Sequence, residues 1–375
     1  MSSWKTLGAL ALLGTASMVS AQEINLSGFA SAHVTQQLSG SSHPEYYSRK
    51  TNYFNFTKFG LNVASQINEK WSVQSQLLVS GRRIDVGATS PQWNMHANWL
   101  FASFRPNPNL RLRFGRQLFP AWMVSENIDV GYMYPWIETP HAVYELSPFK
   151  SINGASTDYT FQLNDAQKLT VTLFGGQEDL IIPLADGGNA TNYYGSVVGS
   201  EVALNGNGYR FRVMGSNYKV KTSSTNSSGA LEGPFENNNV KVVTTGFRYD
   251  KNNIVVYTEY GFREGSKAAT PVTGSALMTN TVSSRPYDRK AQVGYITAGY
   301  WFDTYLPHLT ASKTKWETGI VEGTQDLYSI GLNHKLNDNM MFKSNIGYSI
   351  SDKGPAHMEN QGDSTTFAAG LDMIF

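Results

Sequence analysis

The sequence predicts an all-β protein, a transmembrane antiparallel β-barrel of about 16 strands. Three observations lead to this fold class. Stretches of about ten residues place an apolar side chain at every second position, which gives a strand one apolar and one polar face. Short polar turns alternate along the chain with much longer connections. The last nine residues, FAAGLDMIF, form a strictly alternating strand that ends on Phe375. Alternating strands joined by short turns on one rim and long loops on the other are typical of outer-membrane barrels.

The first clear hairpin covers residues 58–80 and shows how the strands are recognised. Phe59, Leu61 and Val63 share one parity, and small or polar residues occupy the other. The turn at 68–70 follows, and alternation resumes from Trp71. Similar alternation marks four further stretches, at 110–115, 209–214, 340–350 and 367–375. In residues 291–302 both parities are apolar, so the pattern does not fix which face points inward.

The spacing of the turns gives the strand count. Seven short turns are predicted near 68–70, 105–109, 164–167, 205–208, 249–253, 303–306 and 337–339. Eight long connections are predicted near 36–50, 82–95, 116–154, 178–195, 221–239, 264–289, 315–325 and 352–364. Fifteen connections join 16 strands, with the short turns on one rim and the long loops on the other. A β-sandwich seldom has this asymmetry, and no propeller-like repeat is visible.

Aromatic residues flank the short turns, as expected for a belt at a membrane interface. The predicted belt residues are Trp71, Tyr209, Tyr249, Trp301 and Tyr305.

The N-terminus and the composition indicate export. Residues 1–21 combine Lys5, a short apolar stretch and small residues before Gln22, which is typical of a cleaved signal peptide. Residues 22–375 would then form a single barrel domain. The chain has no cysteine, which excludes disulfides and thiolate chemistry. Its 30 basic and 29 acidic residues nearly balance, which argues against nucleic acid as a partner.

The strand pattern, together with one sequence motif, resembles a known family, the trimeric porins of Gram-negative bacteria. "LRFGRQ" at 112–117 is similar to the end of the fifth strand in that family, and the longest connection, 116–154, follows it. The resemblance implies an outer-membrane homotrimer whose long third loop folds into the lumen. It also implies a water-filled channel for passive diffusion of small hydrophilic solutes and ions, with Phe375 read by the barrel-assembly machinery. Packing of this loop over the external rim or at the trimer axis remains an alternative.

A field across the pore is the expected basis of selectivity. Carboxylates of the loop would face basic side chains on the polar parity of the wall, and charges in a confined lumen interact strongly. The predicted loop acids are Glu126, Asp129, Glu138 and Glu145. The predicted wall bases are Arg82, Arg111, Arg113, Arg210 and Arg212. Lysines 58, 335 and 343 also lie on the polar parity, so the wall bases together outnumber wall acids such as Glu201, Glu259 and Asp372, and a mild anion preference is expected.

Other functions remain as alternatives. A substrate-selective channel for anions, sugars or peptides, or a plugged structural or adhesin barrel, would share the same strand pattern. The seven histidines form no nucleophile motif, so no enzymatic activity is expected. No cofactor is expected, because the Gly-rich stretch "LNGNGY" at 204–209 precedes no helix and reads as a hairpin turn.

Overall fold

The fold is described by a computed structural model of the chain. It describes residues 24–40, 49–53, 55–82, 92–183, 189–225, 231–232, 238–265, 290–317, 322–352 and 362–375. The predicted signal peptide, residues 1–21, lies outside the described residues.

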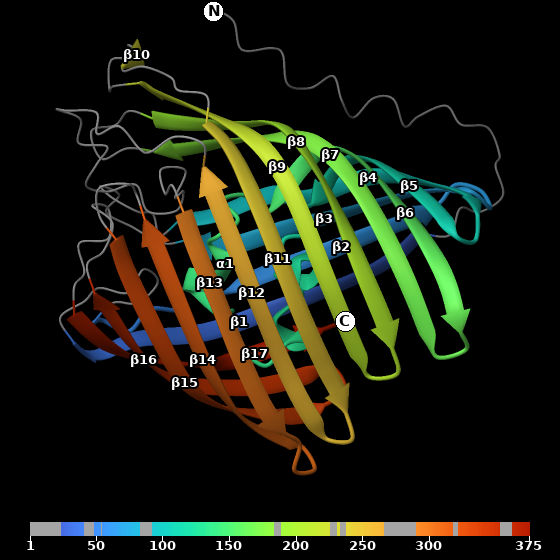
Figure 1. The fold of residues 1–375 in the computed structure, drawn as a ribbon. Coiled ribbons are helices and arrows are strands. Elements are labelled where there is room, and N and C mark those ends of the chain that lie inside the picture. The colour runs from blue at the N-terminus through green and yellow to red at the C-terminus, as the bar shows by residue number, and fades with distance from the viewer. Residues whose placement is uncertain are drawn as a thin grey trace, which may run out of the picture.

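The described strands form one closed antiparallel sheet (Figure 1). Apart from a two-residue strand, consecutive strands pair with each other, and β1 (Ile24–Gly40) pairs with both β2 (Lys58–Gln66) and β17 (Gly362–Ile374). That strand, β10 (Leu231–Glu232), pairs in the described residues with β9 (Tyr209–Thr225). β9 also pairs directly with β11 (Asn238–Lys251), so the closed ring contains 16 strands. The predicted 16-stranded antiparallel barrel is therefore confirmed.

The first half of the sheet contains β1 (Ile24–Gly40), β2 (Lys58–Gln66), β3 (Trp71–Arg82), β4 (Gln92–Asn107), β5 (Leu110–Leu118), β6 (Ser151–Asn164), β7 (Gln167–Pro183) and β8 (Asn189–Gly206). The second half contains β9 (Tyr209–Thr225), β10 (Leu231–Glu232), β11 (Asn238–Lys251), β12 (Ile254–Gly265), β13 (Lys290–Tyr300), β14 (Tyr305–Glu317), β15 (Glu322–Asn337), β16 (Met340–Asp352) and β17 (Gly362–Ile374). The short helices are Ser125–Asn127 and Gly131–Met133, both 3-10, and α1 (His141–Tyr144).

The two ends of the described chain complete the ring. The N–H of Phe375 donates to the carbonyl oxygen of Gly28 at 3.0 Å, and the N–H of Gly28 donates back at 2.7 Å. The Phe375 ring stacks on Phe59, with ring centroids 5.9 Å apart. A Cβ atom added at Gly28 would lie 2.5 Å from the Phe375 ring, so the last residue packs directly over a glycine of the first strand.

The two faces of the sheet differ in chemistry and in exposure. On one face large apolar side chains are exposed, such as Leu309 at 60% and Ile330 at 67%. On the other face polar and charged side chains are buried, including Arg212 and Lys343 at 0%. Buried polar groups require partners, so the polar face must be covered by something that satisfies them.

The seven predicted short turns are all present, because each lies between two consecutive strands. The long connection predicted at 178–195 is wrong, since β7 and β8 remain paired from Glu178 opposite Tyr194 to Pro183 opposite Asn189. Backbone hydrogen bonds continue there although apolar and polar side chains do not alternate. The strand prediction depended on that alternation and therefore ended the strands too early.

The ambiguous stretch 291–302 owes its pattern to packing on both faces. In β13, Val293 and Tyr295 are buried on the polar face, and Ile296 and Tyr300 are exposed on the other. The prediction that Trp301 belongs to an aromatic belt is wrong, because Trp301 packs against the buried apolar cluster. In contrast, Trp71 is exposed and stacks on Phe104 at 4.7 Å.

Candidate functional site

The polar face of the sheet is contacted by the connection between β5 and β6, residues 119–150, here called the β5–β6 segment. It contains the three short helices and a dense set of buried apolar side chains. Trp136 packs edge-on against Tyr257 and Tyr295, and its indole N–H donates to Thr297 at 2.9 Å. Such large aromatic surfaces supply most of the apolar area that holds the segment in place.

Glu259 of β12 forms the first polar anchor of the segment. Its buried carboxylate accepts hydrogen bonds from the N–H of Met123 at 2.6 Å and from the hydroxyls of Tyr144 and Tyr295, both at 2.7 Å. Burial, reinforced by the nearby charge of Glu259, raises the pKa of Tyr144 well above its usual value. Tyr144 therefore stays a neutral donor at all physiological pH values.

Arg212 of β9 forms the second anchor, close to the first. Its guanidinium donates to the carbonyl oxygens of Pro120 and of Ala121, the latter at 2.8 Å, and pairs with Glu201 at 2.5 Å. Arg212 also lies 3.9 Å from Glu259. A buried guanidinium is tolerated here because acceptors from both the wall and the segment surround it.

Lys343 of β16 forms the third anchor on a different part of the ring. Its ammonium group donates to the carbonyl oxygens of Gly131 at 2.5 Å, Tyr134 at 2.7 Å and Trp136 at 3.1 Å, and it pairs with Asp372 at 3.0 Å. Three backbone acceptors and one carboxylate compensate the cost of burying the charge.

Asp129 forms the fourth anchor, on the opposite side from the first two. Its carboxylate accepts from Asn98 of β4 at 2.9 Å and lies 3.7 Å from Lys58 of β2 and 3.5 Å from Lys150. Burial alone would raise the pKa of Asp129, but Lys150, Lys58 and the amide of Asn98 together lower the pKa below its usual value. The carboxylate is therefore ionised at neutral pH.

These anchors fix the course of residues 124–128. Met123 is held on β12, whereas Asp129 is held against β2 and β4. The five residues between them run from one part of the ring to another part that is distant in strand order.

The four predicted loop acids lie in different environments. Glu126 is exposed, whereas Asp129 is buried at the fourth anchor. Glu138 and Glu145 flank His141, at 3.6 Å and 2.7 Å from its ring nitrogens. Glu138 lies three residues before His141 and Glu145 four residues after it, so this spacing was a local signal that sequence reasoning did not use.

The predicted wall arginines are paired with acids of the same wall. Arg111 lies 2.7 Å and Arg113 3.1 Å from the carboxylate of Asp158. Arg210 lies 3.0 Å from Glu201, which it shares with Arg212. Arg82 ends β3, and its side chain is outside the described part of the structure.

Sequence reasoning missed several charged residues of the polar face. Asp158 lies directly opposite Arg111 in the pairing of β5 and β6, so strand parity could have placed it there. Arg116 forms a two-pronged pair with Glu178, at 2.7 and 2.8 Å, in a part of β7 that was predicted to be loop. Arg248 of β11 was also missed.

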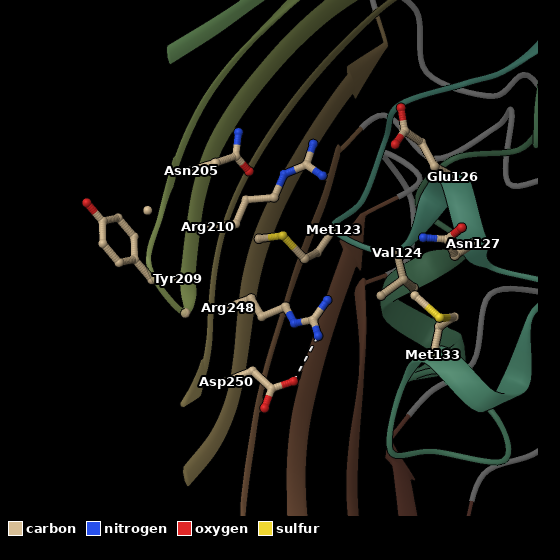
Figure 2. Close-up of a pocket in the computed structure, with 12 residues that line it drawn as sticks. Met123, Val124, Glu126, Asn127, Met133, Asn205, Tyr209, Arg210, Arg248 and Asp250 are labelled. Carbon is tan, nitrogen blue, oxygen red and sulfur yellow. Dashed lines mark hydrogen bonds and ion pairs between the residues drawn. The ribbon is translucent and has the colours of Figure 1, made fainter. Parts of the chain in front are cut away.

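A cavity of about 320 Å³ lies between the β5–β6 segment and the wall (Figure 2). The segment lines it with Met123, Val124, Glu126, Asn127 and Met133. The wall lines it with Asn205, Gly206, Gly208, Tyr209, Arg210, Arg248 and Asp250. Of the predicted site residues, Glu126 and Arg210 are thus brought to opposite sides of one cavity.

None of the helices in the described ranges is long and apolar enough to cross a membrane. Within those same ranges, no group of three His, Cys, Asp or Glu side chains could hold a metal ion.

Comparison with solved structures supports the fold assignment. The trimer form of OmpT from Vibrio cholerae matches with a TM-score of 0.59 and 10% identity, over 95% of this chain and 100% of that chain. The anion-selective porin from Comamonas acidovorans matches with a TM-score of 0.56 and 10% identity, over 94% and 100%. The outer membrane channel DcaP of Acinetobacter baumannii matches with a TM-score of 0.59 and 9% identity, over 94% and 97%. No family model matches the chain, and neither does any curated protein.

Proposed function

We propose that this protein is an outer-membrane porin, a water-filled channel for passive diffusion of small hydrophilic solutes and ions. The observation that carries the proposal is the closed ring of 16 strands with a large apolar surface on one face and charged residues on the other. A closed barrel satisfies all backbone groups internally, which is what hydrocarbon requires of a spanning sheet. A ring of this size encloses more space than wall side chains fill.

In this proposal the apolar face contacts lipid, and the β5–β6 segment lies in the lumen and narrows it. The anchors at Glu259, Arg212, Lys343 and Asp129 support this position, because all four hold the segment against the polar face. Residues 124–128 would cross the lumen and form one edge of the constriction. The arginines 111 and 113 would line its other edge.

Three further features belong to the proposal and await their own tests. The chain would be exported with residues 1–21 as a cleaved signal peptide and would function as a homotrimer in the outer membrane. Phe375, which closes the ring on Gly28, would be read by the barrel-assembly machinery. The proposal assigns no enzymatic activity to the chain. Support comes from solved structures with the same fold, which include a porin, an outer membrane channel and a trimer form of OmpT.

Planar-bilayer recording of the purified protein tests the proposed function. We expect stepwise ionic conductance that is ohmic at low voltage and, for a trimer, steps that occur in groups of three. Absence of conductance from folded, heat-modifiable protein would identify a plugged barrel instead.

A further inference from the structure

Two arginines of the cavity wall lie directly opposite each other, and each retains N–H donors beyond the one carboxylate that it pairs with. Arg210 of β9 and Arg248 of β11 are register partners, so they lie directly opposite each other on the polar face. Like charges at directly opposed positions of an antiparallel pair destabilise the sheet. Arg210 pairs with Glu201 at 3.0 Å and Arg248 with Asp250 at 2.9 Å. Each guanidinium thus uses one acceptor, although it has five N–H donors.

Both guanidinium groups remain accessible from the cavity. The side chains of Arg210 and Arg248 are 31% and 34% exposed, and both line the cavity. In Figure 2 both project from the wall toward the β5–β6 segment. A carboxylate placed between them would accept from two planar donors at once, which is the geometry that arginine favours.

The opposite side of the cavity offers a negative and an apolar surface. Glu126 and Asn127 lie on the segment, across the cavity from the two arginines (Figure 2). Met123, Val124 and Met133 line the same side, and methionine side chains adapt to apolar ligands of varied shape. The cavity therefore has two arginines and Asp250 on its wall side, and an apolar lining with Glu126 on its segment side.

We propose that this cavity is a binding subsite for small zwitterionic solutes with an apolar body, such as short apolar peptides. The solute carboxylate binds Arg210 and Arg248, its ammonium group binds Glu126, and its side chains contact the methionines. The volume of about 320 Å³ lies at the lower end of the range for ligand pockets, which fits a solute of this size. The inference rests on the proposed channel function and specifies the solute class that the channel retains longest.

Solute-induced block of single-channel current tests the subsite. The probe is the dipeptide Leu-Leu, added to the side of the bilayer that exposes the short turns. Three matched compounds each remove one feature: N-acetyl-Leu-Leu lacks the ammonium group, Leu-Leu amide lacks the carboxylate, and Gly-Gly lacks the apolar body. We expect saturable block by Leu-Leu, with each of the other compounds about fivefold weaker.

Variants assign the block to the named residues. Arg248→Gln and Glu126→Gln should each raise the half-blocking concentration of Leu-Leu about fivefold, and Arg248→Lys should restore part of the loss. Glu126→Gln should also abolish the advantage of Leu-Leu over its N-acetyl derivative. Lys335→Gln removes a charge near a short turn outside the cavity lining and should leave block unchanged.

The results separate the subsite from the channel itself. Ohmic conductance with no block by Leu-Leu, or block that both variants leave unchanged, overturns the subsite and leaves the channel intact. Equal block by Gly-Gly overturns the apolar part of the proposal. A lack of any conductance overturns the proposed channel function, and with it the subsite.

Discussion

The main-chain N–H of Met123 donates a 2.6 Å hydrogen bond to the carboxylate of Glu259, which lies 136 positions further along the chain. This bond joins the β5–β6 segment to β12, and the same carboxylate accepts from Tyr144 and Tyr295. One buried side chain therefore holds both arms of the segment, near its start and near its end. Its removal should affect the whole segment rather than one contact.

Replacement of Glu259 by Gln should loosen the segment. The amide offers one acceptor oxygen to three donors, so at least one buried donor loses its partner, at a cost of about 1–3 kcal/mol. We expect a lower denaturation midpoint in detergent and increased open-channel noise. Tyr144→Phe removes one donor and should have a smaller effect.

Glu322→Gln is the control for that variant, because Glu322 is exposed and pairs with Lys315 at 3.4 Å. If Glu259→Gln changes neither stability nor noise beyond this control, the carboxylate does not anchor the segment.

The anchor at Asp129 should resist mild acid. Its pKa is lowered from an ordinary value of 3.8, so its stabilising contribution is complete above about pH 4 and is lost as the pH falls through the lowered pKa. The difference in unfolding free energy between the wild type and Asp129→Asn should stay constant from neutral pH to about pH 5. It should shrink only below about pH 4. A difference that already declines between pH 6 and pH 5 would contradict this ion pairing.

Neutralising Arg111 and Arg113 together should shift the channel toward cations. Both pair with Asp158, so the double Gln variant leaves that carboxylate without its two partners. In a tenfold salt gradient we expect the reversal potential to move toward cation selectivity, on the order of 10 mV of the roughly 59 mV that full selectivity gives. Asp158→Asn should move it in the opposite direction. Identical reversal potentials in all three proteins would remove these residues from the constriction.

Substitution at Gly28 should disturb the closure of the ring. An added Cβ would lie 2.5 Å from the Phe375 ring and 2.7 Å from the carbonyl oxygen of Gly60. Because backbone on one side cannot give way, Gly28→Ala should cost about 1–3 kcal/mol through overpacking. Phe375→Ala in the same background should recover part of this loss. Additive losses in the double variant would show that the two residues do not contact each other in the assembled protein.

The strands of the ring could be predicted from the sequence because two local patterns mark them. Apolar side chains occupy every second position of a strand, and polar residues occupy each short turn, so the turns at 68–70 and 337–339 could be predicted directly. The end of the β7–β8 hairpin could not be predicted in this way. Backbone pairing continues there to Pro183 and Asn189, but the side chains do not alternate between apolar and polar.

The candidate site was harder to predict because its pairs come from distant parts of the sequence. Parity placed Arg111 and Arg210 on the polar face, but it did not give their partners. Asp158 lies opposite Arg111 in the strand register, whereas Glu201 lies opposite Met214 and still pairs with Arg210. Glu126, a loop acid, and Arg210, a wall base, line one cavity. Tertiary folding alone decides that Asp129 meets Lys58 instead.

The third anchor has a consequence for biogenesis. Lys343 reaches Gly131 across 212 positions of sequence, and Asn333 reaches Pro135 across 198. These bonds can form only after β15 and β16 have joined the sheet, and contacts of such long range form late. Trp136 can pack against Tyr257 and Tyr295 once β12 and β13 have joined, but the carbonyl oxygens of Gly131, Tyr134 and Trp136 still lack Lys343. The last polar contacts of the segment therefore form only when the chain is nearly complete. We expect a chain truncated before β15 to lack these contacts around residues 131–136, and a protease to cleave it there more readily.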